Sequence, residues 1–393
     1  MKKNVLKIAF LLTLSFNSCD KAELTQNEIT QANKTSSQET MRQSSMFNYI
    51  ESINVNNGLN TECENNILIF PSWEKYHETI EKLDDLTEDY CNAFDANIPA
   101  DISDEEYDAL CESAGFDEDN ILRQFEEDLA FCSLRQKIET EETAWLEEQG
   151  DGEWNADEDP DNDFIDEESE RELLSHGHEV IIGSREKGYT IYKFYDDMGS
   201  YITINGLNVE ALNAINNGTP ASSLPNVTTY TPPRPNGKCK DKVKEVKYEW
   251  NNDNRIKRIS KVRPAIGSSS NSNYQTNNSI FPSKIKAKTV GYKKNRRGKW
   301  KKKRTWIVAA INAENHTVGG IGFIDCDVAT EPILEEKNKR RKKVKVKKTS
   351  VTTIATVGSP NRFNYTLNDN KLYSRHQQGV IFINKDYYDM PEN

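Results

Sequence analysis

Acidic and basic residues are segregated along this chain of 393 residues. Residues 62–175 contain 39 Asp and Glu against 6 Lys and Arg, whereas residues 238–348 contain 31 Lys and Arg against 10 Asp and Glu. The net charge of −12 for the whole chain conceals this division. A chain of this length predicts about two domains. Charge asymmetry between them indicates either a charged partner or attraction between the two halves.

Proline content predicts a boundary between the two regions. Residues 216–237 contain five prolines and few apolar side chains, which is typical of a semi-rigid, extended linker. We therefore expect an acidic α+β domain over residues 46–215 and a basic all-β domain over residues 238–393. The number and spacing of the basic-region strands predict an antiparallel sandwich or barrel.

Hydrophobic periodicity predicts the elements of both domains. Helical spacing of apolar residues indicates helices at 72–86, 103–115, 121–131, 133–149 and 209–215, the second of which opens on a capping box formed by Ser103 and Glu106. Short apolar runs indicate strands at 67–70, 179–183, 189–195 and 201–205. Runs rich in Val, Ile, Thr, Tyr and Trp indicate seven basic-region strands at 243–250, 255–263, 285–292, 299–312, 318–326, 344–356 and 379–384.

The N-terminus predicts secretion and lipidation. Lys2 and Lys3 precede an apolar run that is too short to span a bilayer, and a small residue directly precedes Cys19. Residues 1–18 are therefore interpreted as a lipoprotein signal peptide, with Cys19 as the lipid-attachment site. Residues 19–45, rich in Gln, Asn, Ser and Thr, predict a disordered tether. We expect a protein anchored in the outer membrane that faces the periplasm or the cell surface; an ordinary signal peptide is the alternative.

The cysteine count agrees with an oxidising compartment. Seven cysteines are present, and lipidation of Cys19 leaves an even six. If the chain divides near residue 235, Cys239 and Cys326 have only each other, which predicts a disulfide between them. Three pairings remain open for the other four, Cys63, Cys91, Cys111 and Cys132. Buried thiols that behave as small apolar side chains are the alternative.

Three short motifs of the acidic region resemble a recurring set of uncharacterised secreted lipoproteins of Bacteroidota. They are DPDNDFI at 159–165, EVIIG at 179–183 and YKF at 192–194. The resemblance extends over residues 66–215 and to the N-terminal start. This chain departs from it in having Asp163 where a histidine is expected. That family has no established activity, so the resemblance implies location and organisation and supplies no catalytic residue.

Four carboxylates match the spacing of a calcium loop. Asp157, Asp159, Asp161 and Glu168 fall at positions 1, 3, 5 and 12 of the template, and hard cations require several convergent carboxylate oxygens. Position 6 is Asn162 in place of the usual glycine. The alternative is a solvated connector in a strongly acidic stretch.

A basic hairpin is the more specific binding signal. Lysines alternate along 284–288, which predicts a lysine row on one sheet face with aromatic side chains nearby. The residues that we predict to contact a polyanion, such as an anionic polysaccharide, are Lys286, Lys288, Trp300, Lys301 and Lys303. The alternatives are a strand edge that lysines protect from aggregation and an intramolecular contact with the acidic domain.

No nucleophile elbow, phosphate-binding loop or dinucleotide fingerprint occurs in the sequence. We therefore expect a cell-envelope lipoprotein that acts as a non-enzymatic binding or structural module. The alternative is a calcium-binding surface protein or a metal-dependent enzyme, for which calcium at 157–168 or zinc at His176 and His178 would be the cofactor.

Overall fold

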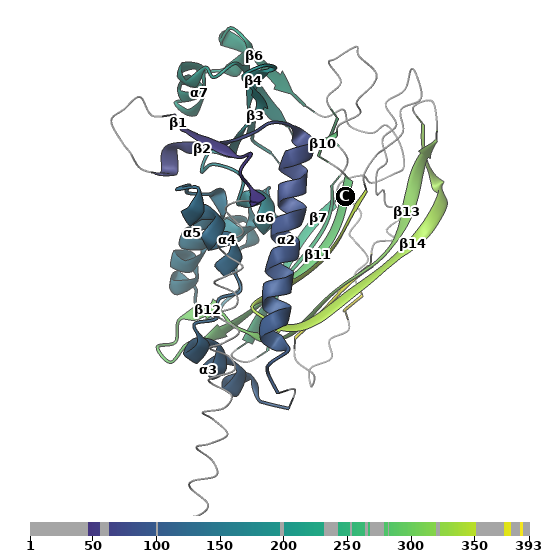
Figure 1. The fold of residues 1–393 in the computed structure, drawn as a ribbon. Helices are drawn as coiled ribbons and strands as arrows, with labels where there is room; N and C mark the ends of the chain where they lie inside the picture. The colour runs from purple at the N-terminus through teal and green to yellow at the C-terminus, as the bar shows by residue number, and fades with distance from the viewer. Residues whose placement is uncertain are drawn as a thin grey trace, which may run out of the picture. The chain divides into compact units, whose positions relative to one another are not determined.

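The computed structural model describes a mixed α+β fold (Figure 1). The described residues are 46–55, 63–99, 101–196, 200–231, 243–251, 254–263, 266–267, 279–281, 283–319, 323–350, 373–378 and 386–387. The predicted signal peptide, Cys19 and the tether at 19–45 lie outside them. Within the described part of the chain, no helix has both the length and the apolar character that crossing a membrane requires.

The chain divides into two compact units. The first, here the helical unit, comprises the described residues 46–50 and Glu78–Ala130, and the second, the sheet unit, comprises Glu51–His77 and the residues from Phe131 onward. The predicted boundary at 216–237 therefore falls inside one unit. Strands that follow residue 237 contact an acidic stretch that precedes it, as described below.

The helical unit contains α3 (Asp104–Ala114), α4 (Asn120–Asp128) and most of α2 (Trp73–Asp95), which begins in the sheet unit. The capping box that begins α3 is confirmed, since Ser103 Oγ accepts from Glu106 N (3.2 Å) while Glu106 Oε2 accepts from Ser103 N (2.8 Å). Gly115 ends the helix at φ 63°, a left-handed conformation that favours glycine. The α2 helix runs beyond the predicted end at residue 86.

A six-stranded sheet forms one part of the sheet unit. Its strands lie in chain order: β1 (Glu51–Asn54), β2 (Asn66–Phe70), β3 (Glu179–Ser184), β4 (Gly188–Phe194), β5 (Tyr201–Asn205) and β6 (Val227–Tyr230). The β2–β3 pair is parallel, and the other neighbours are antiparallel. Helix α7 (Val209–Asn216) packs Ala211 and Leu212 against the isoleucines of one face, which are Ile67, Ile69, Ile181, Ile191 and Ile204.

Part of the predicted linker is this sheet's edge strand. Residues of β6 pair with β5, and Tyr230 stacks on Tyr201 with ring centroids 4.8 Å apart. Val227 packs against the isoleucine cluster from the same strand. Four β-branched and aromatic residues, VTTY, within a proline-rich stretch thus form a short strand, which the composition of 216–237 concealed.

The basic region contributes further antiparallel strands to the sheet unit. A five-stranded sheet contains β12 (Trp300–Lys302), β11 (Ser283–Lys294), β8 (Asn254–Arg263) and β7 (Val243–Asn251) in that order, and β15 (Lys343–Ser350) also pairs with β11. A four-stranded sheet contains β14 (Phe323–Arg341), β13 (Thr305–Gly319), β16 (Tyr373–Gln378) and β17 (Asp386–Tyr387), and β9 (Ile266–Gly267) pairs with β10 (Ser279–Phe281). The predicted strand at 299–312 is two strands, and β14 extends well beyond the predicted end at 326.

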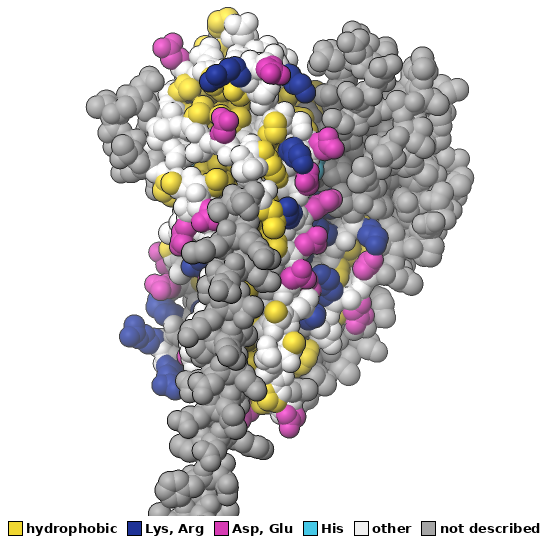
Figure 2. All heavy atoms as spheres, in the orientation of Figure 1, with side chains coloured by type: hydrophobic (Ala, Val, Ile, Leu, Met, Phe, Trp, Pro, Cys, Tyr) yellow, Lys and Arg dark blue, Asp and Glu magenta, His cyan; other side chains and the backbone are white. Residues whose placement is uncertain are grey.

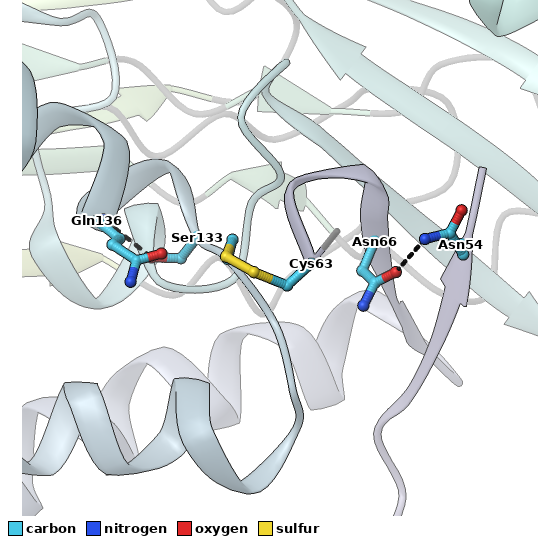
Figure 3. The surroundings of a disulfide bond; sticks show 6 residues. Asn54, Cys63, Asn66, Ser133 and Gln136 are labelled. Atoms are coloured by element: carbon cyan, nitrogen blue, oxygen red, sulfur yellow. Dashed lines mark hydrogen bonds between the residues drawn. A yellow bond between two sulfur atoms is a disulfide. The ribbon is translucent and has the colours of Figure 1, made fainter. Parts of the chain in front are cut away.

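One disulfide joins two elements of the sheet unit (Figure 3). Cys63 begins the turn before β2, and Cys132 precedes Ser133, which caps α5 (Leu134–Glu148) by accepting a hydrogen bond from Gln136 N at 3.2 Å. This selects one of the three pairings that the sequence left open. Cys91 and Cys111 are buried as thiols. Cys239 lies outside the described residues, so its bond to Cys326 stays a prediction.

Candidate functional site

A row of lysines lies on one face of the five-stranded sheet. Residues paired across antiparallel strands share a face. Lys286 of β11 is paired with Lys347 of β15, and Val290 of β11 is paired with Lys257 of β8 and Lys343 of β15. The basic face, as we name it, comprises Lys257, Lys284, Lys286, Lys288, Lys302, Lys343, Lys345 and Lys347.

Residues 151–172, here the acidic segment, contact this basic face. The segment contains twelve Asp and Glu and a single cation, Arg171. Its regular structure consists of 3₁₀ turns at 156–158 and 160–162 and the short helix α6 (Glu168–Arg171). Side-chain oxygens of Asn155, Asp159 and Asp163 accept hydrogen bonds from the backbone N–H two residues further on, at 3.0, 2.9 and 2.8 Å. Asp and Asn at this spacing therefore fold the segment into successive tight turns.

Lys257 lies among three carboxylates. Its Nζ is 2.7 Å from Asp159 Oδ2, 2.7 Å from Asp161 Oδ2 and 3.8 Å from Glu142 Oε1 of α5. The Tyr248 hydroxyl of β7 donates to Asp159. The side chains of Lys257, Asp159 and Asp161 are all buried. A lysine ammonium group thus lies where a metal ion would neutralise these carboxylates.

Two further cations bind Asp161. Lys288 Nζ lies 3.2 Å from Asp161 Oδ2 and 3.2 Å from Glu168 Oε1. Arg171 Nη1 donates to Asp161 Oδ1 at 2.5 Å, and its other nitrogens donate to the backbone carbonyls of Asp161, at 2.9 Å, and Ile165. Because its rigid guanidinium reaches a side chain and two carbonyls together, Arg171 holds the turns of the acidic segment from within.

Glu167 is surrounded by lysines of the basic face. Lys284, Lys286 and Lys347 lie 3.4, 3.9 and 4.0 Å from its carboxylate oxygens, and Lys345 contacts it directly. The neighbouring Asp166 binds Lys286 Nζ through its backbone oxygen, at 2.6 Å, and through Oδ2, at 3.0 Å. One buried carboxylate therefore joins β11 and β15 to the acidic segment.

Pairing keeps the buried carboxylates ionised. Burial alone would raise the pKa of Asp161, but Lys257 and Lys288 hold that pKa well below its usual range. Burial likewise opposes ionisation of Glu167 and Glu168, yet the neighbouring lysines hold both pKa values well below the usual range. Burial also disfavours the charged form of Lys257, whose pKa the facing carboxylates nevertheless hold well above its usual value. The contact is therefore a layer of ion pairs, here the ion-pair layer.

An aromatic cluster anchors the start of the acidic segment. The Trp154 ring packs edge to face on Tyr292 and Trp300, with centroids 5.4 and 5.3 Å apart. The Arg255 guanidinium lies 4.3 Å from the centroid of Trp154 and 4.8 Å from that of Trp300, and donates to two backbone carbonyls of the segment at 2.7 Å. Cation–π contacts and hydrogen bonds together fix this end.

The residues predicted to bind a polyanion do not share one open face. Lys286, Lys288 and Trp300 are 1%, 2% and 2% exposed. Lys301 is exposed and Lys303 is half-buried. The alternation along β11 is confirmed by the register, but the acidic segment covers the resulting lysine row. On the face drawn in Figure 2, acidic and basic side chains of the described residues are interspersed.

The predicted calcium ligands do not surround a common cation site. Asp157 is exposed, whereas Asp159 and Asp161 bind Lys257 and Glu168 binds Lys288. Among the described residues, no group of three or more His, Cys, Asp and Glu side chains is arranged to hold a metal ion. The spacing that matches a calcium template here produces turns whose carboxylates face lysines.

The predicted zinc ligand His178 has a different role. Its Nε2 lies 2.9 Å from Asp163 Oδ2, and its ring stacks on Phe164 with centroids 4.5 Å apart. Burial would raise the pKa of Asp163, but the contact with His178 lowers it. His178 therefore ties the acidic segment to β3, which begins at the next residue.

Sequence reasoning missed Glu142, Asp166 and Glu167 as partners of the lysine row. The available signal was a nearly cation-free acidic stretch together with lysines at every second residue of a predicted strand. This combination indicated an intramolecular contact, but only as one of several alternatives. The individual ion pairs join residues that are mostly about a hundred or more positions apart in the chain. The sequence near either partner contains no signal for such a pairing.

Comparisons with known proteins give little further information. No family model matches the chain, and no curated protein matches it. Among solved structures, it is similar to a DUF4848 family protein from Bacteroides thetaiotaomicron, with 12% identity, coverage of 86% of this chain and 97% of that chain, and a TM-score of 0.17. A likeness at this level carries no argument about fold or activity.

Proposed function

We propose that this protein is a non-enzymatic lipoprotein of the cell envelope that binds anionic polysaccharide through the hairpin between β11 and β12. The observation that carries the proposal is a group of exposed cations at the tip of that hairpin, residues 293–303. Arg296, Arg297, Lys299 and Lys301 are all exposed there. We call this group the cationic tip.

The cationic tip is held in one conformation. Asn295 Oδ1 accepts hydrogen bonds from Arg297 N, at 2.9 Å, and Lys299 N, at 3.0 Å. Asn295 N donates to Lys299 O at 2.8 Å, and Gly298 takes a φ of 75° that favours glycine. Trp300 anchors the returning strand in the aromatic cluster. Because the backbone of this turn is ordered before binding, only side-chain freedom is lost when these cations bind a ligand.

The buried basic face is the less suitable site for the same ligand. Its lysines already contact carboxylates of the acidic segment, several of them at 2.6–3.4 Å. A polymer would have to displace these carboxylates, and a buried charge that loses its partner is strongly destabilising. The support for surface binding therefore comes from the tip alone.

We also propose that the basic strands pack as an antiparallel sandwich. Its support is a contact between the five-stranded and four-stranded sheets: Thr289 Oγ1 of β11 donates to Val308 O of β13 at 2.7 Å. At Gly291 a Cβ atom would lie 3.1 Å from a methyl group of Thr305. A sandwich of this kind would give the cationic tip a rigid support.

Binding is tested with dextran sulfate and neutral dextran, which share a backbone and differ in charge. We expect the full chain to bind dextran sulfate alone, with an affinity that falls steeply as salt rises because bound cations release counterions. Arg296→Gln/Arg297→Gln should weaken binding roughly tenfold at low salt and flatten the salt dependence. The matched control is Arg185→Gln/Lys187→Gln, which removes two exposed cations from the β3–β4 turn. Equal affinities of the two double variants, or equal binding of both polymers, would refute the proposal.

The proposed anchor has a separate test. Metabolic labelling with a palmitate analogue should mark the wild-type protein and not Cys19→Ala. Fractionation should then recover the wild type with outer membranes and the variant in a soluble fraction. Labelling that is unchanged in Cys19→Ala would remove the lipoprotein part of the proposal without affecting the dextran sulfate result.

A further inference from the structure

Two buried cysteines lie in one cluster of the helical unit. Cys91 of α2 and Cys111 of α3 are 6% and 0% exposed. Their cluster also contains Phe94, Tyr107 and Phe116. The two sulfur atoms therefore belong to the same packed interface between two helices.

The contacts between α2 and α3 bring the two cysteines to the same level. The Tyr107 hydroxyl donates to Asp95 Oδ1 at 2.7 Å, which brings the start of α3 to the end of α2. Phe116, just beyond α3, stacks on Tyr90 with ring centroids 5.3 Å apart, so the end of α3 meets an earlier turn of α2. Cys91 lies one helical turn before Asp95, and Cys111 lies one turn after Tyr107. In helices that run in opposite directions, these steps lead to the same point of the interface.

A shared neighbour supports this placement. Burial raises the pKa of Tyr90 to about 12, and the Cys91 and Cys111 thiols both add to the shift. Tyr90 packs against the cluster that contains both cysteines. The Cys91 thiol also donates a weak hydrogen bond to Glu118 O at 3.9 Å. Oxidation of the thiol would remove this hydrogen bond, which costs little stability.

We propose that Cys91 and Cys111, which are thiols in this structure, are oxidised to a second disulfide that links α2 to α3. The Cys63–Cys132 bond already implies an oxidising compartment, in which facing thiols are converted to disulfides. In the step, each thiol loses one proton and one S–S bond forms between the two sulfur atoms. The two electrons reduce the disulfide of a thiol oxidoreductase, or glutathione disulfide, to two thiols.

The experiment is peptide mapping of the full chain. The chain is refolded from the reduced, denatured state in a glutathione and glutathione disulfide buffer, alkylated without reductant and digested. Trypsin is uninformative, because residues 83–123 contain both cysteines and no internal Lys or Arg. A glutamate-specific protease cuts at Glu105 and Glu106, between the two cysteines. We expect the Cys91 and Cys111 peptides to stay joined until reductant is added.

The Cys63–Cys132 peptides serve as the internal control for oxidation. If these peptides are joined while Cys91 and Cys111 are alkylated separately, the proposal is wrong. Thermal unfolding gives a second measurement: reductant should lower the Tm of Cys63→Ala/Cys132→Ala by several degrees, because one constraint on the unfolded chain remains to be removed. The same shift should be absent when Cys91→Ala and Cys111→Ala are added. An equal response of both variants to reductant would also overturn the proposal.

Discussion

Two acidic regions of this chain have similar composition, but the carboxylates of α2 in the first and those of the acidic segment in the second have opposite surroundings. Residues 78–130 of the helical unit contain 19 acidic and 2 basic residues, and the acidic segment contains 12 acidic and 1 basic. In the helical unit, Glu81, Asp85 and Asp89 are exposed on α2. In the acidic segment, Asp161 and Glu167 are buried beside lysines of the five-stranded sheet.

The difference shows that composition alone does not decide what an acidic run does. Exposed carboxylates on a helix stay hydrated and repel one another weakly. Carboxylates in successive turns against a lysine-bearing sheet lose their water and depend on their partners. The first arrangement should tolerate substitution, and the second should not.

The largest expected effect is at Lys257. Lys257→Met removes the cation that the buried Asp159 and Asp161 share, so the free energy of unfolding should fall by about 3–5 kcal/mol. Urea denaturation of the full chain gives the value. Lys187→Met, at an exposed turn, is the matched control and should change stability little. A loss below about 1 kcal/mol at Lys257 would mean that the ion-pair layer is not decisive for folding.

Acid should act mainly on the ion-pair layer. The pKa values of Asp161, Glu167 and Glu168 are held well below their usual range. Their contribution to the free energy of unfolding is therefore complete above about pH 4, where the same groups titrate in the unfolded chain. It is lost as pH falls further, by about 1.4 kcal/mol per pH unit for each group. Urea denaturation curves measured at several pH values below about pH 4 give the change in the free energy of unfolding per pH unit. Glu167→Gln should have a shallower slope than the wild type, and an identical slope would contradict the assignment.

An exposed ion pair provides the contrast with the buried ones. Lys348 Nζ lies 2.7 Å from Glu335 Oε1, and their side chains are 51% and 41% exposed. Because water and salt screen such a pair, Lys348→Met should cost no more than about 0.5 kcal/mol. Comparison with Lys257→Met in the same urea assay isolates the effect of burial. A cost as large as that at Lys257 would show that burial is not the relevant difference.

The smallest expected effect is in the helical unit, and it has the opposite sign. Asp85 and Asp89 are four residues apart on α2, where like charges repel. Asp89→Asn should therefore stabilise the protein by about 0.2–0.5 kcal/mol. Differential scanning calorimetry at low salt measures the gain, which high salt should abolish. Destabilisation would indicate that this carboxylate also has an essential cationic partner.

Several local features were predictable because neighbouring residues determine them. The capping box at Ser103 needs a hydroxyl and a carboxylate three residues apart, and both hydrogen bonds are present. The lysine row along 284–288 follows from the two-residue repeat of a strand. In contrast, β6 was hidden by the prolines around it, and β14 by a charge run that resembles a loop more than a strand.

The chain's own sequence thus determined its local periodicities, its helix caps and the separation of its charges, because each depends on residues close together in the chain. Only the tertiary structure decided that neither face of β11 between residues 284 and 292 would meet solvent. Lysines at 286 and 288 would suit an open polyanion surface as well as a buried layer. Residues 151–172, far away in sequence, cover that face, and desolvation together with close pairing turns a predicted binding surface into part of the interior.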